Sequence, residues 1–312
     1  MNVYEIHGPA YILVYLAALA VSILFAFIAI NIIRLSGRGT YEKGLRLHPY
    51  ELAYLNEGSA AALRTALTYL IKVGIADLKN GDTIPAVVVA PGFEELLEEL
   101  HNTRRAESEL KDLELAEELE TAILRAGDGK SWTQIQGAGY HLDSTLAKIQ
   151  MKLRRANLLV SVSKEQMMKG VLFLFVLAPP FVLGFPRMIE VFHTHRPAGI
   201  LLVLTLFSFV LPFLLFGLVK LRTHAGEEFL DKQKSRNWGL KTTVVNSMEN
   251  DSNISAHDQS LAVALFGMTA IGTIGLVGAD KFFNPVSSGS GSGCSGGCGG
   301  CGGCGGCGGC GG

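Results

Sequence analysis

The stretch Ala198–Val219, AGILLVLTLFSFVLPFLLFGLV, decides how the rest of the chain must be arranged. It has 22 residues and no charged side chain. A helix rises about 1.5 Å per residue, so this stretch reaches roughly 33 Å and can cross a hydrocarbon core of about 30 Å. Arg196 precedes it and Lys220 and Arg222 follow it, as suits helix ends whose basic side chains reach the headgroups. The sequence therefore predicts a membrane span at 198–219.

Two further apolar runs predict additional spans. Residues 11–33 carry no charge, and residues 1–10 hold no Lys or Arg. A cleaved signal peptide needs a basic start and a shorter apolar core, so we interpret this run as a retained transmembrane anchor. Residues 170–186 form a short run with two adjacent prolines, which favours a kinked crossing over a re-entrant segment. With an external link at 187–197, this crossing and the stretch 198–219 form a transmembrane hairpin.

Basic residues set the predicted orientation of these three spans. They flank both ends of the hairpin. Four more directly follow the first anchor: Arg34, Arg38, Lys43 and Arg46. Because Lys- and Arg-rich loops stay in the cytoplasm, residues 1–10 are expected outside the membrane. Residues 34–169 are expected in the cytoplasm, together with a polar, loosely ordered segment at 220–260 that contains some helix near 225–233.

The cytoplasmic residues 34–169 predict a mainly α-helical domain of the α+β class. In the unit 48–90, two helices separated by a glycine precede two short strands around Asn80-Gly81-Asp82, which is the order of a winged-helix-like unit. Residues 93–126 predict one long acidic helix. Residues 131–162 predict a second helical unit that ends in a strand.

Charge is unevenly distributed within this domain. The acidic run 94–120 and the basic segment 148–169 either pair with each other, or the basic segment lies against anionic lipid headgroups. Across residues 34–169, 18 basic residues face 19 acidic ones. The domain therefore lacks the basic excess that a phosphate backbone requires, and a protein partner is expected rather than nucleic acid.

The apolar segment 261–278 allows more than one interpretation, because Gly, Thr and Ala supply much of it. Such residues contribute little to membrane insertion, so the segment is a weak fourth span, an interfacial helix or a docking helix. The choice decides on which side of the membrane the rest of the chain lies. Thiols outside the cell can oxidise, whereas thiols in the cytosol stay reduced.

The C-terminal tail, residues 287–312, contains all the cysteines of the chain. They are Cys294, Cys298, Cys301, Cys304, Cys307 and Cys310. From Cys298 onward they recur every third residue, and two thiolates at this spacing can chelate a soft ion such as Zn²⁺ or Cu⁺, or exchange with a disulfide. Gly, Ser and Cys alone form no core, so the tail is expected to be disordered unless something binds it.

These features favour a function without catalysis. The sequence contains no P-loop, Gly-x-Ser-x-Gly, His-Glu-x-x-His or dinucleotide fingerprint. The predicted function is a membrane-anchored scaffold or sensor whose thiol-rich tail binds soft metal or responds to redox state. One alternative is a substrate protein whose tail is modified or crosslinked by partner enzymes. A second is a membrane-tethered regulator that binds nucleic acid through its helix pair.

The run Leu47-His48-Pro49-Tyr50-Glu51-Leu52-Ala53-Tyr54-Leu55, followed by Gly58 and by Lys72-Val73-Gly74, resembles an uncharacterised bacterial membrane-protein family. Its members share an N-terminal anchor, this helix pair, a two-span hairpin, a segment like Ala262–Gly267 and a Gly-rich, often Cys-rich tail. Asn56-Glu57 departs from the family pattern, which has small residues there. The resemblance implies a bacterial protein of the inner membrane and supplies no activity.

Overall fold

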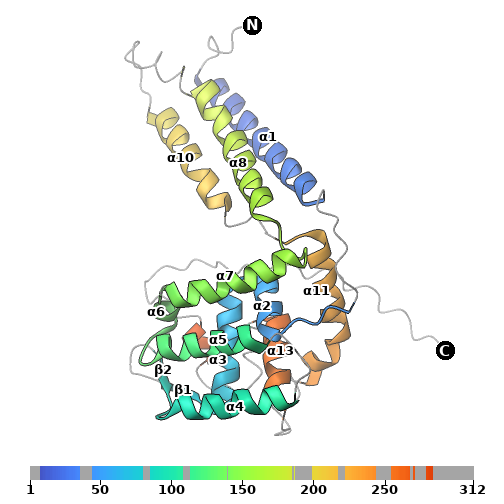
Figure 1. Cartoon of the computed structure of the whole chain (residues 1–312). Coiled ribbons are helices and arrows are strands. Elements are labelled where there is room, and N and C mark those ends of the chain that lie inside the picture. Colours follow the sequence, from blue (N-terminus) through green and yellow to red (C-terminus); the bar gives the residue numbers. More distant parts are fainter. Residues whose placement is uncertain are drawn as a thin grey trace, which may run out of the picture.

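The computed structural model describes residues 8–35, 44–79, 85–107, 113–138, 140–184, 186, 199–216, 222–243, 254–267, 270 and 279–283. These residues are mostly helical and include one small sheet of two strands. Figure 1 shows two parts: the long helices α1 (Gly8–Leu35), α8 (Val162–Pro179) and α10 (Gly199–Phe216) lie side by side, and a group of shorter helices lies beneath them.

Two helical stretches are long and apolar enough to cross a membrane, namely Tyr11–Ile33 in α1 and Val162–Gly184. The second stretch joins α8 to a π-helical turn, η2 (Pro180–Gly184). The kink expected at the two prolines is therefore a change of helix type, because proline has no N–H to continue the α-helical ladder. Within α10 the described apolar stretch is shorter, Val203–Pro212. The two long stretches indicate that the protein associates with a membrane.

The unit after the first anchor follows the expected order. It contains α2 (Pro49–Glu57), α3 (Ser59–Val73), β1 (Ala76–Lys79) and β2 (Ala86–Val89). Gly58 separates the helices at a φ of 88° and Gly74 ends α3 at a φ of 85°, backbone conformations that glycine adopts without strain. The strands pair antiparallel, from Ala76 opposite Val89 to Lys79 opposite Ala86. The turn predicted at 80–82 lies outside the described residues.

The long acidic helix predicted at 93–126 is wrong, because the structure has two helices there. They are α4 (Phe93–Glu107) and α5 (Leu113–Gly127). His101 Nε2 lies 3.1 Å from Glu120 Oε2, whereas 19 residues of continuous helix would separate them by about 28 Å. The chain therefore reverses, which lets α5 pack against α3 and α7 (Tyr140–Arg155) and bury the apolar stripe that includes Leu119 and Ile123.

The strand predicted at the end of 131–162 is also wrong for the described residues. Leu159 makes a single antiparallel bridge with Arg222, and α8 begins at Val162. A strand needs a partner along its length, and the segment after Arg222 turns at once into α11 (His224–Arg236). The unit 131–162 otherwise consists of the short helix α6 (Trp132–Gln136) and α7.

The helix expected near 225–233 is confirmed by α11, but the expectation that the segment 220–260 is otherwise loosely ordered is wrong for its described part. Phe229 and Leu230 of α11 are buried in the domain core. A further helix, α13 (Ala256–Phe266), packs against α2 and α3 and buries Ala262 and Val263. The last described helix, α15 (Ala279–Phe283), lies in the same core. Helices from both sides of the predicted hairpin thus complete one domain.

Candidate functional site

The six predicted metal ligands, Cys294, Cys298, Cys301, Cys304, Cys307 and Cys310, lie outside the described residues, so their geometry stays a prediction. Within the described ranges, no group of three or more His, Cys, Asp or Glu side chains could hold a metal ion. The structure instead defines where the chain leaves the domain before the tail. Three features of the domain bear on function: this point of departure, a buried ionic network and a cavity beneath the long helices.

The last described helix, α15, ends in an aromatic cluster. The ring centroid of Trp132 lies 5.0 Å from that of Phe283 and 6.1 Å from that of Phe282. All three side chains are buried, with Phe282 only 1% exposed. The Ser-Gly linker begins at Ser287, four residues after Phe283. The tail is thus attached to the core of the domain through α15.

Asn56 holds the C-terminal part of the chain against α2. Its Nδ2 donates hydrogen bonds of 3.0 Å to the carbonyl oxygens of Ala264 and Leu265, near the end of α13. Its Oδ1 accepts a 3.0 Å hydrogen bond from Lys234 Nζ of α11. Beside it, Glu57 fills the space next to Gly267, where an added Cβ would lie 2.5 Å from Glu57 Oε1. Asn56 and Glu57 therefore have a structural role, the docking of α13 and α11 against α2.

Glu120 lies at the centre of a buried ionic network that joins α2, α3, α4 and α5. Its carboxylate accepts hydrogen bonds from Arg104 Nη1 at 2.8 Å, from His101 Nε2 at 3.1 Å and from the Tyr50 hydroxyl. Arg104 Nε donates to the Tyr69 hydroxyl at 3.1 Å, and the Arg104 guanidinium carbon lies 4.1 Å from the centroid of the Tyr69 ring. Glu120 has no exposed surface.

The electrostatics of this network favour a charged carboxylate. Burial raises the pKa of Glu120, but the hydrogen bond from His101 and the charge of Arg104 outweigh it, so the pKa lies below its usual value. Burial and the nearby negative charge raise the pKa of Tyr50, which therefore stays protonated and donates to Glu120. Because Glu120 is inaccessible and accepts hydrogen bonds from donors on α2 and α4, the network acts as a structural lock between these helices and α5.

His48 caps α2 from a buried position. Its Nδ1 accepts a 3.4 Å hydrogen bond from the backbone N–H of Tyr50, and the backbone N–H of His48 donates to Glu51 Oε2 at 3.1 Å. Lys152 Nζ of α7 lies 2.6 Å from Glu51 Oε1. Burial lowers the pKa of His48 from 6.5 to about 3. His48 is therefore neutral, as an acceptor at an N-cap must be.

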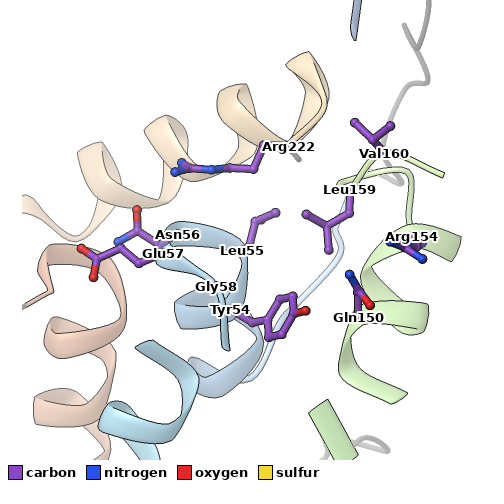
Figure 2. Close-up of a pocket in the computed structure, with 10 residues that line it drawn as sticks. All are labelled: Tyr54, Leu55, Asn56, Glu57, Gly58, Gln150, Arg154, Leu159, Val160 and Arg222. Atoms are coloured by element: carbon purple, nitrogen blue, oxygen red, sulfur yellow. The ribbon is translucent and has the colours of Figure 1, made fainter. Parts of the chain in front are cut away.

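An open cavity of about 250 Å³ lies between the end of α2, the end of α7 and the start of α11 (Figure 2). Its lining residues are Tyr54, Leu55, Asn56, Glu57, Gly58, Gln150, Arg154, Leu159, Val160 and Arg222. In Figure 2, Arg222 extends toward Asn56 and Glu57, while Arg154 and Gln150 come from α7. The cavity is thus lined by segments that enter α8 and that follow α10.

No protein-family model, curated protein or solved structure matches the chain. Function must therefore be inferred from its own residues.

Sequence reasoning missed the buried lock, although a signal for it is present. Glu120 occupies a position on the apolar stripe of α5, four residues after Ala116 and four before Leu124. An acidic side chain on such a stripe needs a buried partner. The partner itself, Arg104, could not be chosen from the sequence, because the reversal between α4 and α5 brings it into reach.

Proposed function

We propose that this protein is a membrane-anchored scaffold or sensor without catalytic activity, whose thiol-rich tail binds soft metal ions or responds to redox state. One observation carries the proposal: α15, the last described helix before the tail, is buried in the core of a domain that also packs at the base of two apolar helices. Metal binding or oxidation at the thiols would therefore act on a tail that continues directly from a helix buried in the membrane-attached domain.

The position of α13 and α15 supports a tail on the same side of the membrane as the domain. Both helices contribute buried residues to one core, and only the 12 residues 267–278 separate them. Leaving and re-entering the domain through a bilayer would need two crossings, or about 40 residues of helix. A docking helix at 261–278 fits this geometry, and a span does not. Because basic residues gather around the domain, we place both domain and tail in the bacterial cytoplasm, where the thiols stay reduced.

Contacts among the long helices support a third span at 198–219 in the inner membrane. The Tyr15 hydroxyl of α1 donates a 3.0 Å hydrogen bond to Ser208 Oγ of α10, and both side chains are fully buried. The Tyr11 hydroxyl donates to the carbonyl oxygen of Leu183 in η2. Polar groups between helices with apolar groups outside are the arrangement that lipid favours. With α1 entering from outside, the N-terminus lies outside the cell.

The winged-helix-like unit serves in this proposal as a module for protein contact. Its second helix, α3, is packed by α2, α5 and α13, and most of its residues from Ala61 to Leu70 are buried. A helix covered on these sides has little surface to place in a DNA groove. This burial argues against the regulator alternative.

A metal titration tests the main proposal. The reduced, full-length protein in detergent is titrated with Zn²⁺ and with Cu⁺, beside a variant in which Cys294, Cys298, Cys301, Cys304, Cys307 and Cys310 are replaced by Ser. The wild type is expected to bind metal and the variant to lose it, because thiolates are the only soft ligands of the tail. Equal uptake by the two proteins, or none by either, contradicts the metal proposal. A tail that carries covalent modifications in intact-mass spectra from the native host favours the substrate alternative.

Thiol labelling tests the location of the tail. A membrane-impermeant maleimide is added to intact cells after reduction and again after permeabilisation. The tail is expected to react only after permeabilisation. The matched control carries the six Ser substitutions and Thr194→Cys in the predicted external link, and it is expected to react in intact cells. Labelling of the wild-type tail in intact cells would overturn the cytoplasmic placement.

A further inference from the structure

The cavity of Figure 2 lies where the chain passes between the domain and the long helices. Leu159 and Val160 directly precede α8, and Arg222 directly precedes α11. The backbone bridge between Leu159 and Arg222 ties these two passages together. Thr223 reinforces the junction, since its hydroxyl donates to the carbonyl oxygen of Asn157 at 2.7 Å. The cavity walls are therefore fixed by the junction itself.

The apolar part of α1 ends next to this cavity. At one end of α1, Tyr11 bonds to Leu183 in η2. At the other end, Ile30 packs in one apolar cluster with Val160 and Met168, and Ile33 packs against that cluster. Val160 thus belongs both to the cavity lining and to the apolar contact between α1 and α8. With α1 in a bilayer, the cavity faces the layer of lipid headgroups.

The lining combines cationic donors with an apolar wall. Arg154 and Arg222 are its two basic residues, and Tyr54 and Gln150 add neutral polar groups. The Nε of Arg154 is buried and has no hydrogen-bond partner among the described residues, although its Nη2 pairs with Glu165. A buried guanidinium donor without an acceptor favours a ligand oxygen at that position.

Positive charge exceeds negative charge at the cavity. Glu57 is the only acidic residue of the lining, and its Oε2 lies 2.8 Å from Arg64 Nη2. Arg154 and Arg222 come from different segments and lie on opposite sides of the cavity (Figure 2), and the planar guanidinium of Arg154, with its Nε free among the described residues, matches an anion with several oxygen atoms. The volume of about 250 Å³ suits a headgroup fragment rather than a large cofactor.

We propose that this cavity binds a phosphate group, supplied by the headgroup of an anionic lipid or by a soluble phosphate ester. Arg154 holds the phosphate oxygens, Arg222 on the opposite side of the cavity adds positive charge, and Tyr54 and Gln150 hold the rest of the headgroup. Leu55, Leu159 and Val160 cover its apolar side. The site goes beyond the proposed role of the tail, because none of its residues depends on the cysteines.

Native mass spectrometry of the full-length protein in detergent tests the proposal. The lipid probe is dioctanoyl phosphatidylglycerol, the phosphate-free control is dioctanoylglycerol and the soluble probe is glycerol 3-phosphate. Phosphatidylglycerol is expected to bind and dioctanoylglycerol is not. Arg154→Gln is expected to weaken binding about tenfold, the usual value of a charge-assisted contact to phosphate, and Arg222→Gln several-fold through the loss of positive charge. Binding of glycerol 3-phosphate alone would assign the site to a soluble ester.

A matched variant separates the cavity from general attraction to anionic lipid. Arg155 is exposed, adjoins Arg154 on α7 and does not line the cavity. Arg155→Gln makes the same charge change as Arg222→Gln and is expected to leave binding unchanged. Glu57→Gln removes the only acidic lining residue and is expected to strengthen binding several-fold, a gain that misfolding cannot produce. The six-Ser tail variant is expected to bind like the wild type.

Two results overturn the proposal. One is the failure of both phosphate probes to bind the wild-type protein. The other is an equal loss of binding in Arg155→Gln and Arg222→Gln, because that pattern describes a diffuse surface charge. Circular dichroism of each variant confirms that the helical content is unchanged.

Discussion

The domain and the long helices differ in how many large apolar side chains they expose. In the domain, Leu67, Leu119 and Leu153 have no exposed surface. In the long helices, Leu13 is 70% exposed and Leu174 is 68% exposed, while Tyr15 and Ser208 are wholly buried. Apolar side chains avoid water, but in lipid they gain nothing by turning inward. The difference teaches that the exposed surface of the long helices suits lipid whereas that of the domain suits water, and Figure 1 shows these two parts of the chain one above the other.

The two regions also differ in how they use charge. The domain places Glu120 and Arg104 inside its core, where each neutralises the other. The contacts between α1 and α10 use a neutral hydroxyl pair, Tyr15 with Ser208. Removing one partner of a buried ion pair leaves an uncompensated charge inside the protein. Removing one hydroxyl between membrane helices leaves only one neutral group without its hydrogen bond, which costs much less stability. The two regions should therefore respond very differently to loss of a polar group.

The largest effect on stability is expected at the buried ionic network around Glu120. Glu120→Gln keeps the shape but leaves Arg104 without its counter-charge, so the free energy of unfolding should fall by about 3–5 kcal/mol. Chemical denaturation in detergent, followed by circular dichroism, measures it. Glu118→Gln is the matched control, because Glu118 is a surface residue paired with Lys148, and its loss should cost about 1 kcal/mol or less. Equal effects at the two positions would mean that the lock is not a buried ion pair.

The aromatic anchor of the tail should respond almost as strongly. Phe282→Ala removes a ring that is 1% exposed and packs on Trp132, so the domain should lose about 3 kcal/mol of stability. Hydrogen exchange of residues 279–283 should rise first, since α15 has only five residues. If exchange there stayed slow, α15 would be held by contacts other than this ring.

A change in pH distinguishes the neutral cap of α2 from the charged lock. The unfolded chain protonates His48 near pH 6.5, whereas the folded pKa is about 3, so stability falls as the pH drops from 6.5 toward 3. At pH 5 the loss should be roughly 2 kcal/mol. His48→Asn keeps an N-capping side chain that does not titrate, so its stability should vary less across this range. Thermal unfolding at pH 7.5 and pH 5 gives the comparison. His257, whose pKa burial also lowers, should leave a residual slope.

Below pH 4.5 the lock adds to this loss. The folded pKa of Glu120 lies under its usual value, so the stability it contributes is lost as the pH falls through the folded pKa. Glu120→Gln should therefore be less sensitive to pH in this lower range than the wild type. A slope that was the same in both proteins would assign acid unfolding to other groups.

The smallest effect is expected between the long helices. Tyr15→Phe removes the hydrogen bond to Ser208, and bonds of this kind in membranes contribute about 0.6 kcal/mol. A double-mutant cycle with Ser208→Ala, measured by unfolding in detergent, isolates the coupling of the two hydroxyls. Coupling as large as the effect at Glu120 would show that this region is less lipid-like than its exposed side chains indicate.

Local patterns in the sequence were enough to predict several elements. The helices at 49–57 and 59–73 and the paired strands that follow them depend on neighbouring residues: a proline at the first turn, glycines with positive φ and an apolar repeat of three to four. Stretches of uncharged apolar residues likewise predicted α1 and the crossing that contains α8.

Elements that depend on distant partners could not be predicted in the same way. The run 93–126 is helical throughout by composition, and only the pairing of His101 and Arg104 with Glu120 shows that α5 folds back on α4. The segment at 261–266 has the composition of a weak span, and its place in the core depends on Asn56, about 200 residues earlier in the chain. The position of Glu120 on an apolar stripe indicates that it needs a buried partner, but in neither case do the neighbouring residues show which distant residue the partner is.

The amino-acid sequence by itself determined which helices are apolar enough to cross a membrane, because charge and apolar length act residue by residue on transfer between water and lipid. Only the tertiary structure decided which helices meet: α13 and α15 enter the domain core, Glu120 finds Arg104, and Arg154 and Arg222 border one cavity. The physical reason is the separation along the chain over which each interaction acts. Burial and helix propensity are properties of a short stretch, whereas a salt bridge or a docked helix exists only after the chain has brought distant segments within a few ångströms of each other.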